Sequence, residues 1–278
     1  MKEMGTVLFS GKKSKKLILL GLIGIILLGA VLYSNILHAP FVFDDHSSIK
    51  ENDSIRSISE SLKNISSNRY LVLLSFAVNY AAGGLKPFGY HLINNLIHVI
   101  NALLVYYLVI LTFRTPYFSN QQSAVSDSPI RPFTHSPLFI AFFSAFIFIA
   151  HPIQTQAVTY IAQRAASMAA MFYLLSLVMY IKWRLVSGQQ TSRAADQSRF
   201  IGTLLLYCAS LFSAILAMKT KEIAFTLPVV IAFYEFSFFN KTAASQYATS
   251  NLRRFFYLLP ILLTLLVIPL SMLNFTAP

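Results

Sequence analysis

The chain contains 278 residues, of which 56% are hydrophobic and only 12% are charged. Soluble domains have about a quarter of their residues charged, so this composition excludes an ordinary soluble protein and indicates one embedded in a lipid bilayer. The net charge of +12 does not indicate a nucleic-acid partner, because no basic patch is interleaved with aromatic residues. The single cysteine, Cys208, excludes an internal disulfide bond.

Apolar runs long enough to cross a membrane, roughly 20 residues each, recur along the chain with short polar breaks. The first is predicted to be a signal anchor, because its apolar stretch is too long for an ordinary cleaved leader. The predicted fold class is therefore all-α, a polytopic integral membrane protein with about seven transmembrane helices. The predicted spans lie near residues 17–37, 90–113, 133–150, 166–182, 200–218, 223–239 and 255–275.

The breaks between these spans differ in charge. If the N-terminus lies in the cytoplasm, most of the 22 Lys and Arg residues fall on the cytoplasmic side, as the positive-inside rule requires. The basicity therefore predicts the orientation of the chain and contact with anionic lipid headgroups, rather than binding of nucleic acid.

The first outer loop, residues 38–89, contains two helical patterns of its own. In IRSISESLKNIS the apolar residues Ile55, Ile58, Leu62 and Ile65 fall three or four apart, which predicts an amphipathic helix in the membrane interface. RYLVLLSFAVNYAAGG predicts a second, more apolar helix that ends at its two glycines. Polar residues thus concentrate on the outer side, and any site is expected to face outward.

The same loop contains FVFDDHSSI, in which Asp44 and Asp45 stand beside His46, a candidate for the substrate pocket. A carboxylate near the hydrocarbon boundary loses hydration and becomes a stronger base. Adjacent residues in an extended segment point to opposite sides, so one aspartate is expected to face a substrate while the other pairs with a cation. The alternative is that the pair caps a helix or is solvated among lipid headgroups.

The second predicted span has polar residues at helical spacing, in GYHLINNLIHVINALL. They are His91, Asn94, Asn95, His98 and Asn101, and they share one face of the helix. Polar groups at membrane depth face a bundle interior or a wet cavity. We favour hydrogen bonds between helices for His98 and Asn101. His91, at the outer end, is the better candidate for a substrate pocket, and no third ligand is spaced to make it a metal site.

Two further outer breaks contain candidate ligands for a phosphate. Arg164 is the only basic residue in HPIQTQAVTYIAQRAASM, where Gln154 and Gln156 are further pocket candidates. A guanidinium at a helix end binds phosphate in a bidentate manner, and the alternative is that it reaches up to lipid headgroups. MKTKEIAFTLP contains Lys219, Lys221 and Glu222, which could form either a phosphate site or an interfacial ion pair. Glu222 is also a candidate for the substrate pocket.

Four segments, taken in chain order, resemble one family. They are FVFDDHSSI, SFAVNYAAGGLKPFGYHLINNLIHVINALLVY, AHPIQTQAVTYIAQRAASMAAMFYLLSL and KTKEIAFTLPVVIAFYE. Together they resemble the membrane half of the GT-C-type glycosyltransferases that carry tetratricopeptide repeats and are related to the protein O-mannosyltransferases. The resemblance implies one GT-C-like transmembrane module over residues 1–278, a polyprenyl-phosphate-linked sugar as donor and an outward-facing site. It also implies a catalytic base in the first outer loop, which falls on Asp44 first and Asp45 second.

The sequence departs from the family in two respects. Gln156 stands where many relatives have Glu, so a second carboxylate is missing there. Family members usually have additional spans and end in tetratricopeptide repeats. The chain is therefore expected to be either a fragment of a longer protein or a short form of the module.

The resemblance implies a membrane glycosyltransferase that transfers a sugar, with inversion, to a hydroxyl of a protein or glycan acceptor. Asp44 would be the base, and Arg164 with Lys219 or Lys221 would hold the donor phosphate. No cofactor or metal-ligand set is predicted, and a divalent ion between Asp44 and phosphate is left open. The predicted location is the bacterial inner membrane, with the active face in the periplasm. The rival hypothesis is a non-catalytic membrane scaffold or partner subunit.

Overall fold

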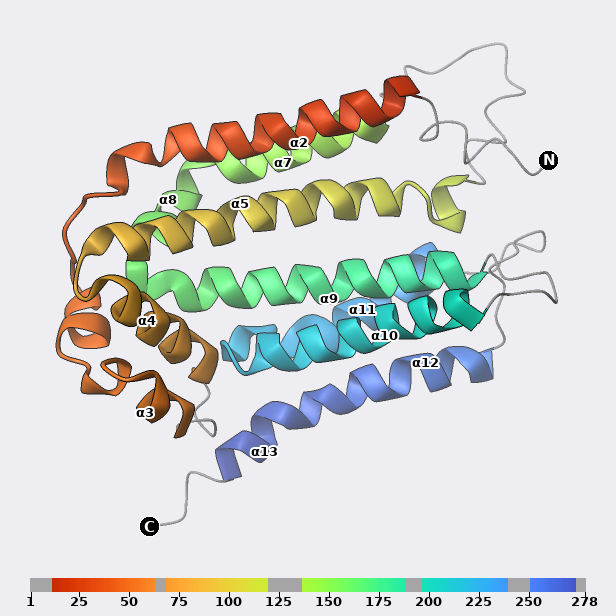
Figure 1. Ribbon diagram of the computed structural model, residues 1–278. Coiled ribbons are helices and arrows are strands. Elements are labelled where there is room, and N and C mark those ends of the chain that lie inside the picture. The colour runs from red at the N-terminus through yellow and green to blue at the C-terminus, as the bar shows by residue number, and fades with distance from the viewer. Residues whose placement is uncertain (1–11, 64–68, 120–136, 189–196, 240–250, 274–278) are drawn as a thin grey trace.

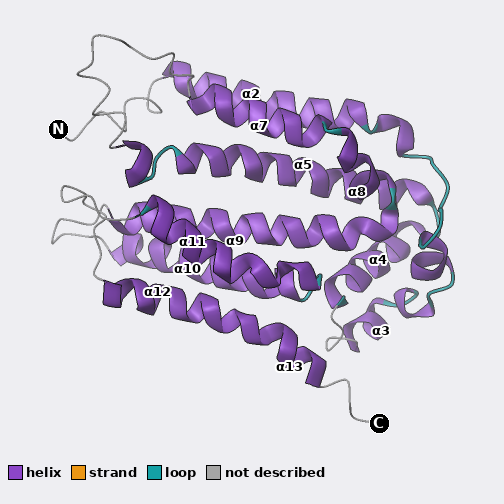
Figure 2. Ribbon diagram, turned by 180° about the vertical axis from the view of Figure 1, so that it is seen from behind, coloured by secondary structure: helices purple, strands orange, loops and turns teal. Residues whose placement is uncertain are grey.

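The computed structural model describes residues 12–63, 69–119, 137–188, 197–239 and 251–273. Every regular element within these ranges is a helix, which confirms the predicted all-α class (Figure 2). The helices of the bundle are α2 (Lys12–Leu32), α5 (Pro87–Thr112), α7 (Pro137–Ala150), α9 (Arg164–Gly188), α10 (Gln197–Met218), α11 (Leu227–Phe238), α12 (Asn251–Leu263) and α13 (Val267–Leu273). The other helices are α3 (Ile58–Lys63), α4 (Tyr70–Gly83) and α8 (Thr155–Thr159), together with single helical turns.

The long helices lie side by side, and the chain runs back and forth between the two ends of the bundle (Figure 1). α5 packs against α7 and α9, α9 packs against α10, and α11 contacts α9 and α12. Half of the apolar stretch is buried in α5 and in α9, against 22% in the peripheral α2. The middle of the bundle is therefore α5 and α9, and the outer helices turn large apolar side chains toward lipid.

Five helices in the described ranges are long and apolar enough to cross a membrane. A sixth span results if α7 and the following segment Pro152–Thr159, bent by 50° at His151, count as one. The predicted run near 223–239 forms only the 12-residue α11 after the 3₁₀ turn Glu222–Thr226, because the chain tightens there before Pro228. The structure thus confirms a polytopic membrane protein, and the count of seven stays a prediction.

The first outer loop folds only partly as predicted. The apolar helix is confirmed as α4, and Gly84 after it has a φ of 59°, which a residue without Cβ adopts readily. The amphipathic helix is shorter than predicted: Ile55 is fully buried in a 3₁₀ turn, and only Ile58 and Leu62 lie on α3. Ile65 lies outside the described residues. We call the end of the bundle that holds α4, α8 and the turn Glu222–Thr226 the α8 end.

Gly29 lets α2 approach α5 and α7 closely. A Cβ atom at this position would lie 2.6 Å from Cγ2 of Val99 and 2.7 Å from Cδ1 of Ile149. Gly29→Leu is therefore expected to push α2 away and to lower the free energy of unfolding by about 1–3 kcal/mol. Thermal unfolding in detergent measures the effect. Gly202→Leu in α10 is the control, because a Cβ atom at that position would meet no heavy atom within 4 Å; equal losses would contradict the close approach.

Candidate functional site

The two adjacent aspartates have different surroundings at the α8 end. Asp45 is fully buried, and its carboxylate accepts the backbone N–H of Ala162 over 2.8 Å and that of Val42 over 3.2 Å. Within the described ranges no ion pair of Asp45 is found, so its predicted cation partner stays a prediction. Two backbone donors hold Asp45 and fasten the first outer loop to the segment before α9. Asp45 also begins the turn His46–Lys50 without capping it through its side chain.

Asp44 remains exposed, so of the two aspartates it is the one that a substrate can reach. Its backbone N–H donates to the hydroxyl oxygen of Tyr160 over 3.0 Å, across 116 residues of chain. Partial loss of hydration raises the pKa of Tyr160, and the neighbouring Asp44 carboxylate adds to this effect. A phenol is protonated at neutral pH, so the Tyr160 hydroxyl can donate a hydrogen bond to the carboxylate beside it. Tyr160 was not among the predicted site residues, because an aromatic residue in a loop carries no distinctive sequence pattern.

Arg164 begins α9 and is fully buried. It donates to Oδ1 of Asn94 over 2.7 Å, to Oδ1 of Asn79 over 2.7 Å and to the carbonyl oxygen of Tyr90 over 2.9 Å. These partners are neutral and come from α4 and α5. The guanidinium thus ties three helices together behind the surface at the α8 end. The structure shows no open face of Arg164 for a donor phosphate, so its predicted role as a direct ligand stays a prediction.

Asn94 extends this network to the loop that carries Tyr160. While its Oδ1 accepts from Arg164, its Nδ2 lies 3.4 Å from the carbonyl oxygens of both Tyr160 and Ile161. The loop 158–162 is therefore held by two side chains, Asn94 of α5 and Asp45 of the first outer loop. Tyr160 is therefore a fixed neighbour of Asp44. Asn94 holds the loop that carries Tyr160, and Asp45 holds the segment that carries Asp44.

The other polar residues of α5 are buried between helices. The hydrogen bonds predicted for His98 and Asn101 are confirmed, with the carbonyl oxygens of Ile149 at 3.3 Å and Ser167 at 2.9 Å. His91 is 1% exposed and its Nε2 lies 3.1 Å from the carbonyl oxygen of Ala39, so the structure places it in the interior. Three buried polar atoms have no hydrogen-bond partner in the described residues: His91 Nδ1, Asn95 Oδ1 and Asn101 Oδ1.

The remaining predicted residues lie at the α8 end but apart from this network. His46 is exposed with Nε2 3.1 Å from the carbonyl oxygen of Phe41. Gln156 and Glu222 are exposed, and Gln154, Lys219 and Lys221 are half-buried. No hydrogen bond or ion pair among the described residues joins the lysines to Asp44. Within the same ranges, no group of three His, Cys, Asp or Glu residues could hold a metal ion.

A small cavity of about 210 Å³ opens where α4 turns into α5. Asn79, Gly83, Lys86 and Phe88 are among the residues that line it. Asn79 connects the cavity to the buried network, because its Oδ1 accepts from Arg164 and its Nδ2 donates to the carbonyl oxygen of Gly89 over 3.2 Å. Lys86 is the exposed cation at its rim.

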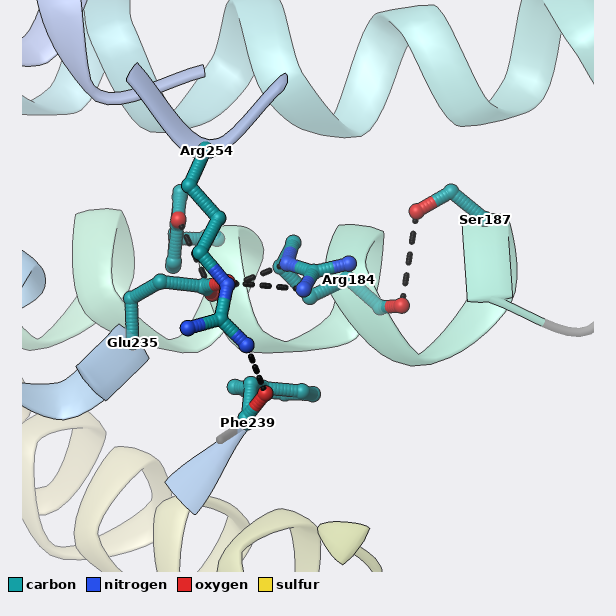
Figure 3. A network of polar contacts seen from close by, with 6 residues as sticks. Arg184, Ser187, Glu235, Phe239 and Arg254 are labelled. Carbon is teal, nitrogen blue, oxygen red and sulfur yellow. Dashed lines mark hydrogen bonds and ion pairs between the residues drawn. The ribbon is translucent and has the colours of Figure 1, made fainter. Parts of the chain in front are cut away.

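A second polar network, drawn in Figure 3, lies at the opposite end of the bundle, where α9 ends and α12 begins. Glu235 of α11 is fully buried and accepts from Nε and Nη2 of Arg184 over 2.8 and 2.7 Å. Tyr180 donates to the same carboxylate over 3.2 Å, and Nε of Arg254 lies 3.7 Å from it. Nη2 of Arg254 also donates to the carbonyl oxygen of Phe239. This network joins α9, α11 and α12 and lies far from Asp44, so we assign it to stability.

The chain is similar to several protein O-mannosyl-transferases. It is 30% identical to TMTC2 of Mus musculus over 234 residues, which cover 79% of this chain and 24% of that protein. It is also 30% identical to Tmtc1 of Drosophila melanogaster over 223 residues, and 31% identical to Tmtc3 of the same organism over 169 residues. These matches cover 75% and 55% of this chain, and 22% and 18% of the two relatives. No family model matches, and no solved structure gives a significant match.

These relatives support the resemblance to transferases of this type, at moderate identity and over most of the chain. They are eukaryotic, so the predicted bacterial membrane stays a prediction. The chain spans about a quarter of the length of the curated relatives it matches. It is thus a membrane-embedded chain similar to one part of the protein O-mannosyl-transferases named TMTC.

Proposed function

We propose that the chain is a membrane glycosyltransferase module, which transfers a hexose from a polyprenyl-phosphate donor to a hydroxyl of an acceptor at the α8 end. The observation that carries the proposal is the separation of the acidic pair: Asp45 anchors the loop while Asp44 stays exposed beside an anchored tyrosine. Similarity to proteins named O-mannosyl-transferases supports a mannosyl group and a protein acceptor.

In the proposed reaction, the carboxylate of Asp44 takes the proton of the acceptor hydroxyl as its oxygen attacks the anomeric carbon. The bond from that carbon to the phosphate oxygen breaks, and the polyprenyl phosphate leaves as an anion that needs no general acid. Attack from the face opposite the phosphate inverts the anomeric centre. Cations that face the developing charge lower the barrier, and Lys219 and Lys221, which are not fully buried, are the proposed ligands.

Arg164 takes a different place in this proposal. Because its guanidinium is buried against Asn79, Asn94 and Tyr90, it would position the loop that carries Tyr160 rather than touch the donor. The pocket is proposed to be lined by His46, Gln154, Gln156 and Glu222. His91 is buried, so it would support the pocket from the interior rather than contact the substrate. The active side is proposed to face away from the cytoplasm, in keeping with the predicted orientation.

Asp44→Asn tests the base directly. The amide cannot accept the proton, so sugar transfer is expected to slow by about 10²–10⁴-fold while the melting temperature stays that of the unmodified protein. The assay is transfer of mannose from a polyprenyl-phosphate donor by the purified full-length protein. Equal rates for Asp44→Asn and the unmodified protein would sink the proposal. Absence of transfer by the unmodified protein would favour the scaffold.

Asp45→Ala is the matched variant at the neighbouring position. It removes the acceptor for two buried backbone donors, so the free energy of unfolding is expected to fall by about 1.5–3 kcal/mol. The two variants therefore differ in the quantity that they lower: Asp44→Asn lowers the transfer rate, and Asp45→Ala lowers the melting temperature. A loss of rate at Asp45 without any loss of stability would contradict the assignment.

A further inference from the structure

Phe43, the residue before Asp44, has an unusual backbone. Its φ of 47° is the only positive φ among the described non-glycine residues. It occupies the second position of a tight turn in which the N–H of Asp45 donates to the carbonyl oxygen of Val42 over 3.0 Å. Glycine dominates this position in turns with positive φ, because a Cβ atom crowds the following carbonyl group. A large side chain is therefore held where glycine would relieve the strain.

The ring of Phe43 contributes little to packing, since Phe43 is 85% exposed. It meets the ring of Tyr160 at 89° with the centroids 6.4 Å apart, so at least one face of the phenyl ring stays open. Strained residues persist where the surroundings determine them, and they cluster at functional sites. Here the surroundings are the buried carboxylate of Asp45 and the contact between Asp44 and Tyr160.

The residues next to Phe43 indicate whether its ring contacts lipid or a polar ligand. A ring that dips into the hydrocarbon would stand among apolar residues, because a carboxylate beside it is costly in lipid. Phe43 is instead followed by the exposed residues Asp44, His46 and Ser47. This combination suits a pyranose ring, since the C–H face of the sugar can pack on an aromatic ring while its hydroxyl groups donate to a carboxylate.

We propose that Phe43 and Tyr160 form an aromatic platform that binds the pyranose ring of the sugar substrate beside the carboxylate of Asp44. This inference rests on the proposed function and adds two contact residues to it. Asp45 and Asn94 then act as positioning residues, because they fix the two segments that carry the platform. The strain at Phe43 is retained because the ring presents a face to the sugar.

A fluorescent reporter tests binding without relying on turnover. Trp183 is the only tryptophan, and the chain with Trp183→Phe and Phe43→Trp has a single indole at the platform. Titration with a mannosyl phosphate that carries a short isoprenoid chain should change its emission in a saturable manner. Methyl mannoside should compete and should itself change the emission, because it occupies the platform. The isoprenoid phosphate without sugar should displace the donor from the phosphate site but should not itself change the emission. Quenching by bilayers of brominated lipid in place of this response would assign the residue to the membrane and overturn the platform.

Phe43→Gly separates binding from stability. It removes the ring and the strain together, so the melting temperature should stay or rise while the KM for the mannosyl donor increases about tenfold. Phe43→Tyr keeps the ring and should keep the KM. Ile153→Ala is the control, because Ile153 is 72% exposed at the same end and lies outside the platform.

An unchanged KM in Phe43→Gly would overturn the platform. If Asp44→Asn still abolished transfer, the proposed function would stand without it. Conversely, a saturable indole response from a protein that transfers no sugar would support the platform and remove the transferase. The two proposals can therefore fail separately.

Discussion

Glu235→Ala is expected to unfold much of the protein at room temperature. The carboxylate is the shared contact of the buried guanidinium groups of Arg184 and Arg254, which are 2% and 3% exposed. Removing one partner of a buried ion pair leaves uncompensated charge in a low dielectric and costs about 3–5 kcal/mol. The fraction that elutes as a folded monodisperse species from size exclusion, and its melting temperature, measure the loss.

Two further variants isolate the role of charge. Glu60→Ala breaks the pair between Glu60 and Lys63 on α3, whose side chains are 55% and 70% exposed, and should change stability by less than about 1 kcal/mol. Glu235→Met combined with Arg184→Met removes both charges of the principal pair at once. The double variant should therefore recover part of the stability that Glu235→Ala loses. If the double variant were no more stable than Glu235→Ala, volume and packing rather than charge would explain the effect.

The Glu235 network also illustrates which features the sequence could predict. The apolar runs predicted the helices, because a bilayer requires about 20 apolar residues and internal backbone hydrogen bonds for each span. Arg184, the principal partner of Glu235, lies 51 residues away in the sequence, and no local sequence pattern indicates that the two residues form a pair. Helix existence is thus a local property of the chain, whereas the pairing of polar residues depends on which helices become neighbours.

The acidic pair shows the same division. Asp44 is exposed while Asp45 is buried, as predicted, but the reason given for it is wrong: the segment is not extended, because Asp45 has helical backbone angles and its N–H closes a tight turn onto Val42. The distant partner of Asp45 is the backbone N–H group of Ala162, 117 residues away, which carries no sequence signature. Tyr160 escaped prediction for this reason, since its importance arises only from the contact with the distant loop.

Arg164→Ala is expected to have the second large effect. It should lower the free energy of unfolding first, and activity should fall as a consequence. The change leaves the oxygens of Asn79, Asn94 and Tyr90 without their donor in the interior, where each unsatisfied polar group costs about 1–3 kcal/mol. We therefore expect a total loss of roughly 3–5 kcal/mol after partial relaxation, in the range of broken buried pairs. Thermal unfolding in detergent or nanodiscs measures it.

Arg164→Lys distinguishes geometry from charge at the same position. An ammonium group keeps the charge but cannot reproduce the planar fork that reaches α4 and α5 together, so it should recover only a minor part of the stability. Lys219→Ala is the matched comparison at the α8 end, because Lys219 is half-buried and proposed to meet the phosphate. It should raise the KM for the mannosyl donor with little change in melting temperature.

The two cations are therefore expected to differ in the quantity that each controls. If Arg164 touched the donor, Arg164→Ala would raise the KM of the folded fraction and leave the melting temperature unchanged, as expected for Lys219→Ala. If it positions the loop that carries Tyr160, the melting temperature falls first, and kcat of the surviving folded protein falls with it because Asp44 loses its anchored neighbour. A pure KM effect at Arg164 would contradict the buried network and restore the direct phosphate contact predicted from the sequence.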